Sequence, residues 1–188
     1  KQNLQEKRKL LHQLQNSVEK PYFLWHLFFK DVFDKGGFDI VIGNPPYIQL
    51  QKMGKMCDAL ETVGYETFTR TGDIYCLFYE LANEKLLKQN GVSCFITSNK
   101  WMRAAYGEVL RKFLLEKTNP IKLIDFGGYQ VFEAATVDTN ILLSEKAKCK
   151  NSIQTCVLGN GLTGLNNMSV FIEQNSVVSK TLQQRTAG

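Results

Sequence analysis

The sequence predicts an α/β fold built around a sheet whose first strands are parallel. Short apolar runs alternate with longer segments in which apolar residues recur at helical spacing. The order strand, helix, strand, helix, strand is typical of parallel strands joined by crossover helices. Hydrophobic residues make up 44% of the chain and charged residues 22%, which is ordinary for a globular domain with a packed core.

Length and composition narrow the class of protein. The 188 residues suffice for one domain, or for one domain and the start of another. The net charge of +5 permits a polyanionic partner without requiring one. No apolar run approaches membrane-spanning length, so we expect no membrane association. The five cysteines form neither a Cys-x-x-Cys pair nor a Cys/His cluster, which favours reduced thiols in a cytoplasmic protein and no metal site.

Residues 1–37 are predicted to form a helical and aromatic lead-in. Lys1–Val18 has the pattern of a helix, and it opens without a cap, so we expect the chain to belong to a longer protein. Pro21–Phe33 is rich in aromatic residues. Core or interface packing is the favoured interpretation of this stretch, and a base-stacking platform is the alternative.

The stretch that organises the prediction begins with the apolar strand Phe38–Ile42, which Gly43 ends. The tetrapeptide Asn44-Pro45-Pro46-Tyr47 follows. Two consecutive prolines neither continue a ladder nor enter a helix, so the backbone past the strand is stiff and extended. In open α/β sheets, ligands bind outside the carboxyl ends of the strands.

The functional groups of these four residues indicate what the site could bind. The side-chain carbonyl of Asn44 and the backbone carbonyl of Pro45 are two acceptors that suit a group with two N–H donors, such as an exocyclic amine. The flat ring of Tyr47 offers a surface on which a base can stack. The combination predicts a site that modifies the amino group of a nucleobase; a proline-rich turn that only closes a strand is the alternative.

Asn44-Pro45-Pro46-Tyr47 after an apolar strand resembles the catalytic motif of the amino-group DNA methyltransferases that make N6-methyladenine. The wider pattern is similar to the adenine-specific methylase domain of type IIG restriction–modification enzymes. The resemblance assigns all four residues to the catalytic motif. The tetrapeptide also occurs in glutamine-N5 and some RNA methyltransferases, so alone it indicates amino-group methyl transfer.

Downstream, Ile48–Gly72 has weak periodicity and is predicted as a loop, either a flap over the substrate or a disordered surface insertion. Asp73 is predicted to cap a helix that Gly91 stops. The remaining predicted elements are a helix over Arg103–Lys117 and strands over Val92–Thr97, Ile121–Phe126, Val137–Ser144 and Ser152–Leu158, with Thr181–Gly188 as an unanchored tail.

The resemblance continues through Thr71–Tyr75, Phe95–Trp101 and Leu110-Arg111. Asn99 and Lys100 follow a strand's carboxyl end and are assigned to substrate binding, although a solvated charge is the favoured alternative for Lys100. Packing is favoured for Trp101. The resemblance also implies that Phe132 holds the flipped base against Tyr47, with a core position as the alternative.

The family binds S-adenosylmethionine through motifs that precede the catalytic strand, and this chain contains neither its glycine-rich turn nor its ribose-binding acid before Phe38. Asn44 is the only residue assigned to the cofactor site. The resemblance therefore implies a partial, Rossmann-like, seven-stranded S-adenosylmethionine-dependent methyltransferase sheet containing the later four or five strands with flanking helices. Residues 38–145 would be the catalytic half, and 146–188 the start of the target recognition region or a tail.

The predicted function is adenine-N6 methylation of double-stranded DNA by part of a restriction–modification enzyme, with no metal required. The chain alone is expected to bind the cofactor weakly or not at all, and to be inactive. Expected partners are DNA, the upstream and downstream segments of the parent chain, and a second copy through an exposed sheet edge. Two alternatives stay open: a protein-glutamine or RNA amino-group methyltransferase, and a non-catalytic nucleic-acid-binding fragment.

Overall fold

The computed structural model describes residues 2–15, 23–132, 137–159 and 168–180. The chain forms two compact units, Lys1–Lys35 and Gly36–Gly188. Within the described residues, no helix has the length and apolar character needed to cross a bilayer.

The first unit is helical. It contains α1 (Gln2–Gln15), α2 (Trp25–Phe28) and α3 (Lys30–Phe33), so the predicted first helix is confirmed over its described part. Phe23 is the centre of an aromatic group: its ring centroid lies 4.7 Å from that of Trp25, 4.9 Å from that of Phe28 and 6.2 Å from that of Phe29. Phe28 remains 64% exposed, so these rings contact one another without forming a closed core.

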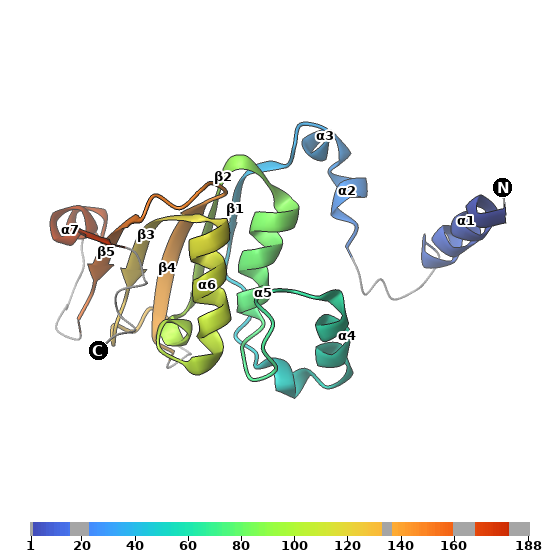
Figure 1. The fold of residues 1–188 in the computed structure, drawn as a ribbon. Helices are drawn as coiled ribbons and strands as arrows, with labels where there is room; N and C mark the ends of the chain where they lie inside the picture. Colours follow the sequence, from blue (N-terminus) through green and yellow to red (C-terminus); the bar gives the residue numbers. More distant parts are fainter. Residues whose placement is uncertain (1, 16–22, 133–136, 160–167, 181–188) are drawn as a thin grey trace. The chain divides into compact units, whose positions relative to one another are not determined.

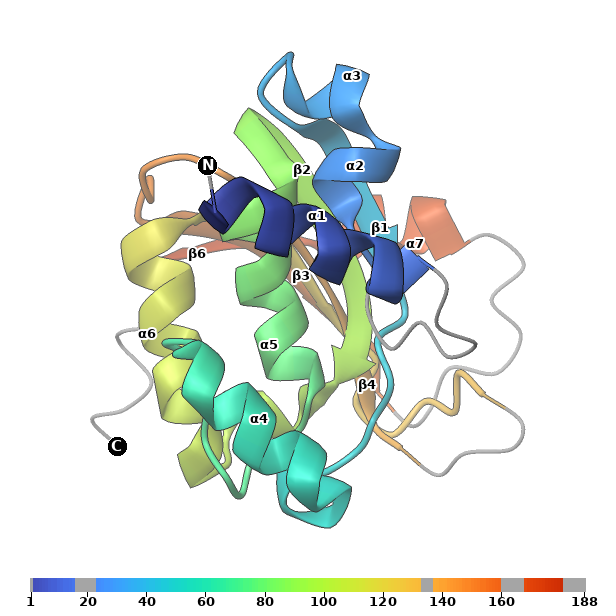
Figure 2. The same cartoon turned by 90° about the vertical axis from the view of Figure 1, so that its right-hand side faces the viewer.

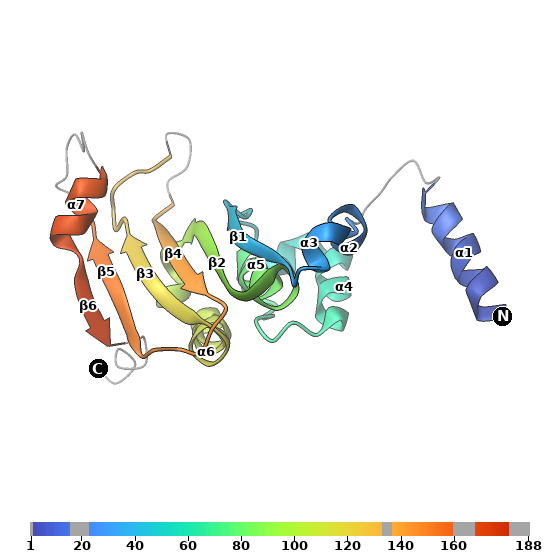
Figure 3. The same ribbon diagram turned by 90° about the horizontal axis from the view of Figure 1, so that it is seen from above.

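The second unit is built on a six-stranded sheet with the order β1-β2-β4-β3-β5-β6 (Figures 1 and 3). The strands are β1 (Phe38–Gly43), β2 (Leu87–Ser98), β3 (Asn119–Asp125), β4 (Thr139–Glu145), β5 (Ser152–Val157) and β6 (Val177–Lys180). β1 pairs with β2 and β3 with β5 in parallel, whereas β4 is antiparallel to both β2 and β3 and β6 is antiparallel to β5. The first three predicted strands therefore run in one direction, as expected, but β4 lies between the second and the third.

Helices cover the two faces of this sheet unequally. On one face, α5 (Tyr75–Glu80), its continuation Leu81–Leu86 and α6 (Glu108–Lys117) pack over the larger core (Figures 1 and 2). That core consists of Tyr75, Cys76, Tyr79, Ala82, Phe95, Trp101, Leu110, Leu114, Leu123, Leu142 and Ile153. On the other face, α7 (Met168–Asn175) packs over a smaller core near β3 and β5 (Figure 3). The sequence did not predict α7 or β6, and the predicted tail lies outside the described residues.

Alternation along the strands explains why the larger core forms. Phe95 and Leu142 are directly opposite in the β2–β4 register, and both are buried. Successive side chains of a strand point to opposite faces, so the neighbours Cys94 and Leu143 form the next row on the other face, where they are half-buried. Cys94 lies inside β2, within the strand that was predicted over Val92–Thr97.

The helix predicted between Asp73 and Gly91 is shorter than expected at both ends. α5 begins at Tyr75 with no side-chain capping bond, and the carboxylate of Asp73 instead accepts a hydrogen bond from the Tyr106 hydroxyl, 3.0 Å away. The helical turns end at Leu86 and β2 starts at once. Gly91 lies inside β2, where a Cβ atom would be 2.8 Å from the Phe38 carbonyl oxygen, so close backbone approach explains this glycine.

The loop predicted over Ile48–Gly72 is also wrong in its secondary structure. It contains a 3₁₀ turn, η1 (Leu50–Met53), and the helix α4 (Lys55–Val63). Leu50 and Cys57 are fully buried and pack with Leu77 of α5 into a core of their own. Weak periodicity misled the prediction because short elements that share one small core do not need a long apolar stripe.

The predicted helix over Arg103–Lys117 begins later, because two 3₁₀ turns precede it: η3 (Asn99–Met102) and η4 (Ala105–Gly107). These turns approach each other closely. A Cβ atom on Gly107 would lie 1.9 Å from the carbonyl oxygen of Trp101, and the φ angle of Gly107 is −74°. Contact, and not backbone conformation, therefore excludes a side chain here.

We expect Gly107→Ala to lower the free energy of unfolding by about 1–3 kcal/mol, because the added methyl group forces the two turns apart. Gly159→Ala is the matched control, since a Cβ atom there meets nothing within 4 Å. Urea unfolding of both variants measures the difference. Equal stability of the two variants would show that the turns relax freely.

Candidate active site

The predicted catalytic tetrapeptide follows the carboxyl end of β1, at the edge of the sheet. Gly43, the last residue of β1, is paired with Phe95, and a Cβ atom on Gly43 would lie 3.3 Å from the Phe95 ring. Asn44 and Pro46 are exposed, whereas Pro45 is buried. The edge strand therefore presents the Asn44 amide to solvent from a backbone that two prolines hold extended.

The Tyr47 side chain is anchored both by its hydroxyl and by its ring. Its hydroxyl donates a hydrogen bond to the Ile96 carbonyl of the neighbouring strand, 3.3 Å away. Its half-buried ring packs on the larger core and meets the Tyr75 ring edge-on, with centroids 6.1 Å apart and an interplanar angle of 89°. Burial raises the pKa of Tyr47, so the phenol keeps the proton that it donates.

Behind the contact between Tyr47 and Tyr75, hydrogen bonds join two tyrosine hydroxyls and a carboxylate. The Tyr75 hydroxyl lies 2.8 Å from that of Tyr106, which in turn donates to Asp73. Tyr75 is fully buried, and Tyr106 is half-buried. The sequence analysis missed this group. Its signal was the pair Asp73 and Tyr75 at the start of a predicted helix, a pattern that gives no hint of Tyr106, 31 residues beyond Tyr75.

The backbone after Tyr47 is tied to the start of α5. The amide of Leu50 donates to the carbonyl of Gly72 at 2.8 Å, and the amide of Ile74 donates to the carbonyl of Ile48 at 2.9 Å. Gln49 and Asp73 form an antiparallel bridge between these bonds. Both ends of the segment that was predicted as a flap are thus fixed at the base of the site.

A buried carboxylate also holds this segment. Glu80 of α5, 8% exposed, accepts hydrogen bonds from the amide of Glu66 at 3.1 Å and from the amide and hydroxyl of Thr67 at 2.8 and 2.9 Å. Arg70 pairs with Asp58 and Glu61 nearby, but these groups are at least half exposed, so their contribution to stability is small.

The carboxyl end of β2 brings Asn99 and Lys100 next to the end of β1. The side-chain amide of Asn99 donates to Asp125 of β3 at 2.9 Å, and the same carboxylate oxygen accepts from the Gly127 amide at 3.0 Å. Asn99 is half-buried and Lys100 exposed. The interpretation of Trp101 as a packing residue is confirmed by its complete burial.

Asp125 is a second residue that sequence reasoning missed. It is buried at the carboxyl end of β3, where an acidic residue before a Gly-Gly pair was a usable signal. Asn140 of β4 lies between the two strand ends, and its amide donates to the Ser98 carbonyl at 3.1 Å. β4 therefore links the end of β2 to the end of β3.

Phe132 lies seven residues beyond the end of β3 and is half-buried. Its carbonyl accepts a hydrogen bond from the Gln130 side chain at 3.1 Å. The neighbouring Tyr129 and Val131 pack on the smaller core. The pairing of Phe132 with Tyr47 around a base remains a prediction, as do the roles of Asn99 and Lys100.

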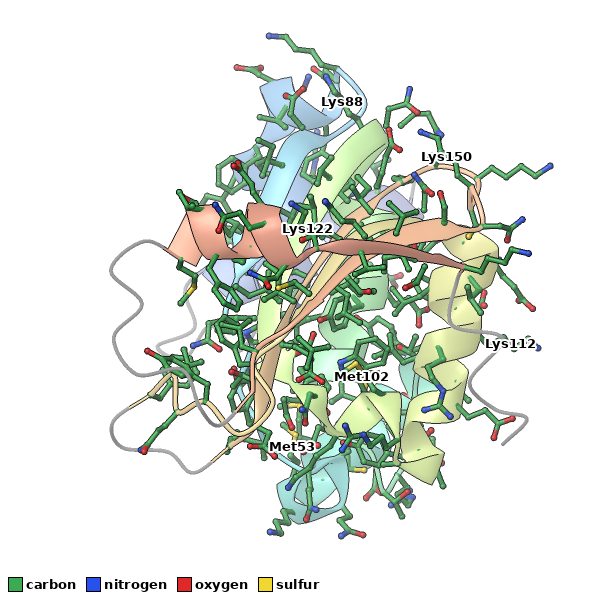
Figure 4. The ribbon with its side chains drawn as sticks, turned by 90° about the vertical axis from the view of Figure 1, so that its left-hand side faces the viewer. Met53, Lys88, Met102, Lys112, Lys122 and Lys150 are labelled. Atoms are coloured by element: carbon green, nitrogen blue, oxygen red, sulfur yellow. The ribbon has the colours of Figure 1, made fainter. Side chains whose placement is uncertain are left out.

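One end of the second unit carries all these groups. Figure 4 shows Met53 of η1 and Met102 of η3 at that end, and Lys88 and Lys150 at the opposite end of the sheet. The elements that follow the strand ends, η1, α4 and η3 with its C-cap, carry four exposed cations: Lys52, Lys55, Lys100 and Arg103. No group of three or more potential metal ligands occurs among the residues that the structure describes.

The comparisons with known proteins identify the family. The model of the Eco57I restriction-modification methylase family matches residues 1–132. The chain belongs to this family. The resemblance to type IIG restriction–modification enzymes is thereby confirmed, and the matched range includes the tetrapeptide after β1.

Similar proteins agree with this assignment. The type II restriction enzyme and methyltransferase RM.Eco57I of Escherichia coli is 32% identical over 117 residues, which are 61% of this chain and 12% of that protein. The type IIG restriction endonuclease BpuSI has a similar fold, with a TM-score of 0.56 at 16% identity over 81% of this chain and 20% of BpuSI.

The partial methyltransferase fold is confirmed by a further structure. A Listeria monocytogenes protein assigned to class I of the S-adenosylmethionine-dependent methyltransferases has a TM-score of 0.52 at 18% identity, over 73% of this chain and 42% of that protein. The chain spans only a small part of the restriction–modification proteins that it matches.

We expect Glu80→Ala to free the segment around Glu66 and Thr67, because two amides and a hydroxyl lose a buried acceptor. The free energy of unfolding should fall by about 1–3 kcal/mol, and limited proteolysis should cut within residues 48–72 sooner. Glu116→Ala, at an exposed position of α6, is the control. Unchanged proteolysis of the Glu80 variant would show that the small core alone holds the segment.

Proposed function

We propose that this chain is the catalytic part of a DNA methyltransferase that modifies the N6 amino group of adenine within a restriction–modification system. The observation that carries the proposal is the exposed Asn44 amide, held by a stiff Pro-Pro backbone beside the anchored ring of Tyr47. Family membership supports methylation of DNA as the reaction.

In the proposed reaction, the target adenine leaves the duplex and its ring lies on Tyr47. Extrusion costs a few kcal/mol, and stacking on an aromatic side chain returns about 1–3 kcal/mol. Phe132 would contact the other face of the base. Asn99 and Lys100, at the end of the adjacent strand, would contact the nucleotide or its neighbours.

The side-chain oxygen of Asn44 and the carbonyl of Pro45 would accept the two N–H groups of the adenine amine. These bonds direct the nitrogen lone pair out of the ring plane and stabilise the positive charge that grows on the nitrogen. The nitrogen gains a methyl group and releases one proton to water. When bound, S-adenosylmethionine would supply the electrophilic methyl group and leave as its neutral thioether.

The described residues fit part of a cofactor site. Asn44 is exposed at the end of an edge strand, beside which a cofactor can lie. We propose that the main cofactor contacts come from upstream segments of the parent chain, so that residues 1–188 alone are inactive. On the outer strand, Ile40 and Ile42 are 65% and 76% exposed, which supports coverage by those segments or pairing with a second copy.

The decisive experiment measures transfer of labelled methyl from S-adenosylmethionine to unmethylated DNA by this chain and by a chain extended upstream. We expect activity only in the extended chain, with the label in N6-methyladenine. Label in N4-methylcytosine would contradict the adenine assignment. Label only in RNA or in release-factor protein would support the alternative methyltransferases, and salt-dependent DNA binding without transfer would support a binding role.

In the extended chain, Asn44→Ala should lower the rate of methyl transfer by about 10²–10³-fold, because the amine loses one of its two acceptors. Gln174→Ala removes an exposed amide on α7 and should leave the rate unchanged. The proposed mechanism is wrong if both variants transfer methyl groups at the wild-type rate.

Lys100→Ala should weaken DNA binding to a similar extent for every sequence and reduce the slope of log K against log salt by about 0.9, as expected for the loss of one phosphate contact. Lys112 is exposed on α6 (Figure 4), and Lys112→Ala is the matched control. Binding titrations at several salt concentrations measure the slopes. Identical slopes would place Lys100 outside the DNA interface.

A further inference from the structure

We propose that Tyr106 and Asp73 are positioning residues that set the orientation of the Tyr47 ring through Tyr75. This inference rests on the proposed function, in which Tyr47 supports the target base. None of these three residues belongs to the catalytic tetrapeptide. They come from the start of α5 and from η4, so two separate elements fix the ring that follows β1.

The hydrogen bonds between these groups have a defined direction. The carboxylate of Asp73 only accepts, so the Tyr106 hydroxyl donates its proton to Asp73, 3.0 Å away. The oxygen of Tyr106 is then the acceptor for the Tyr75 hydroxyl, 2.8 Å away. These bonds fix the position of the Tyr75 hydroxyl, and the complete burial of Tyr75 holds its ring perpendicular to the ring of Tyr47.

Packing keeps Tyr106 in place for this task. A Cβ atom on Gly72 would lie 3.4 Å from Cδ2 of the Tyr106 ring and 3.0 Å from the Thr69 carbonyl oxygen, so the ring lies close against the backbone of Gly72. The same backbone accepts the hydrogen bond from Leu50. Tyr106 therefore contacts the Gly72 backbone, which holds the chain just after Tyr47 through the hydrogen bond from Leu50.

Burial raises the pKa of both Tyr75 and Tyr106, so both hydroxyls keep their protons at neutral pH and the direction of the chain is stable. Tyr75 is completely enclosed, and a change in its χ1 angle would separate its hydroxyl from that of Tyr106. The bond from Tyr47 to the Ile96 carbonyl fixes the hydroxyl end of that ring. The perpendicular contact with Tyr75 restricts the orientation of the ring itself.

The first test observes Tyr47 directly and does not depend on catalysis. The 188-residue chain contains seven tyrosines, and it is labelled with 3-fluorotyrosine for ¹⁹F NMR, with the Tyr47 signal assigned by its loss in Tyr47→Phe. We expect Tyr106→Phe, which keeps the ring and removes the hydroxyl, to shift or broaden the Tyr47 signal. Tyr129→Phe removes a hydroxyl beside the smaller core and should leave that signal unchanged.

The second test measures methyl transfer by the extended chain in a double-mutant cycle. Tyr106→Phe should lower the rate about tenfold in the wild-type background, because a displaced ring supports the base poorly. In the Tyr47→Ala background it should change nothing further, since the ring that it positions is gone. A residue that only stabilises the fold would lower the rate equally in both backgrounds, and this result would overturn the proposal.

The two tests separate the positioning role from the proposed function. A Tyr47 signal that responds to Tyr106→Phe in a protein that methylates no DNA would retain the positioning role and reject the function. Wild-type rates and an unchanged signal in Tyr106→Phe would reject the positioning role alone. If Tyr106→Phe does not fold, Asp73→Asn replaces it in both tests, because it keeps the shape of the side chain and weakens the final acceptor.

Discussion

The parallel pairing of β1 with β2 is the constraint on which the rest of the site depends. β1 has only this neighbour in the described sheet, and the register places Gly43 opposite Phe95. The tetrapeptide consequently starts level with Ile96, close enough for the Tyr47 hydroxyl to reach the Ile96 carbonyl. A shift of the register by one residue would move that carbonyl and would turn Val41 out of the core.

β4 completes the arrangement because it enters the sheet at the same end. The amide of Asn99 donates to the Asp138 carbonyl, just before β4, while the Asn140 side chain donates to the Ser98 carbonyl. Polar groups of β2, β3 and β4 are therefore joined across three neighbouring strands. The β2–β4 ladder fixes the ends of β2 and β4, and Asn99 and Asp125 join the end of β2 to that of β3, 26 residues further along the chain.

Local signals predicted much of this structure. The apolar run before Asn44 and the runs that became β2 to β5 were recognised because buried strands have distinctive composition, and the resemblance supplied the family. The signals failed where one residue satisfied two patterns. Asp73 is a residue type that often caps helices, but its carboxylate accepts a hydrogen bond from Tyr106. Gly91 is a residue type that often ends helices, but here it permits close backbone contact inside β2.

Long-range partners explain why the site was harder to predict than the fold. Asn44 and Tyr47 follow the strand that presents them, so their place on a stiff backbone at its carboxyl end followed from the sequence. Tyr75 and Tyr106 are distant in sequence, and only the packing of η4 against the start of α5 brings their hydroxyls together. No periodicity records such a pair, because each tyrosine alone has the pattern of a core residue.

The site is rigid around Tyr47 and open to solvent around Asn44, and these two properties have different physical origins. Tyr47 packs against the fully buried ring of Tyr75, whose hydroxyl is hydrogen-bonded through Tyr106 to Asp73. The chain just after Tyr47 is held by backbone hydrogen bonds to the start of α5, and all these contacts resist displacement. In front, Asn44 and Pro46 are exposed, and the adjacent strand edge is unpaired in the described sheet. A group that must hold an extruded base benefits from the first property, because side chains that are already fixed lose little entropy on binding. In the proposed reaction, the second would leave space beside Asn44 for the methyl donor, which makes the edge position of β1 as important to that chemistry as the tetrapeptide itself.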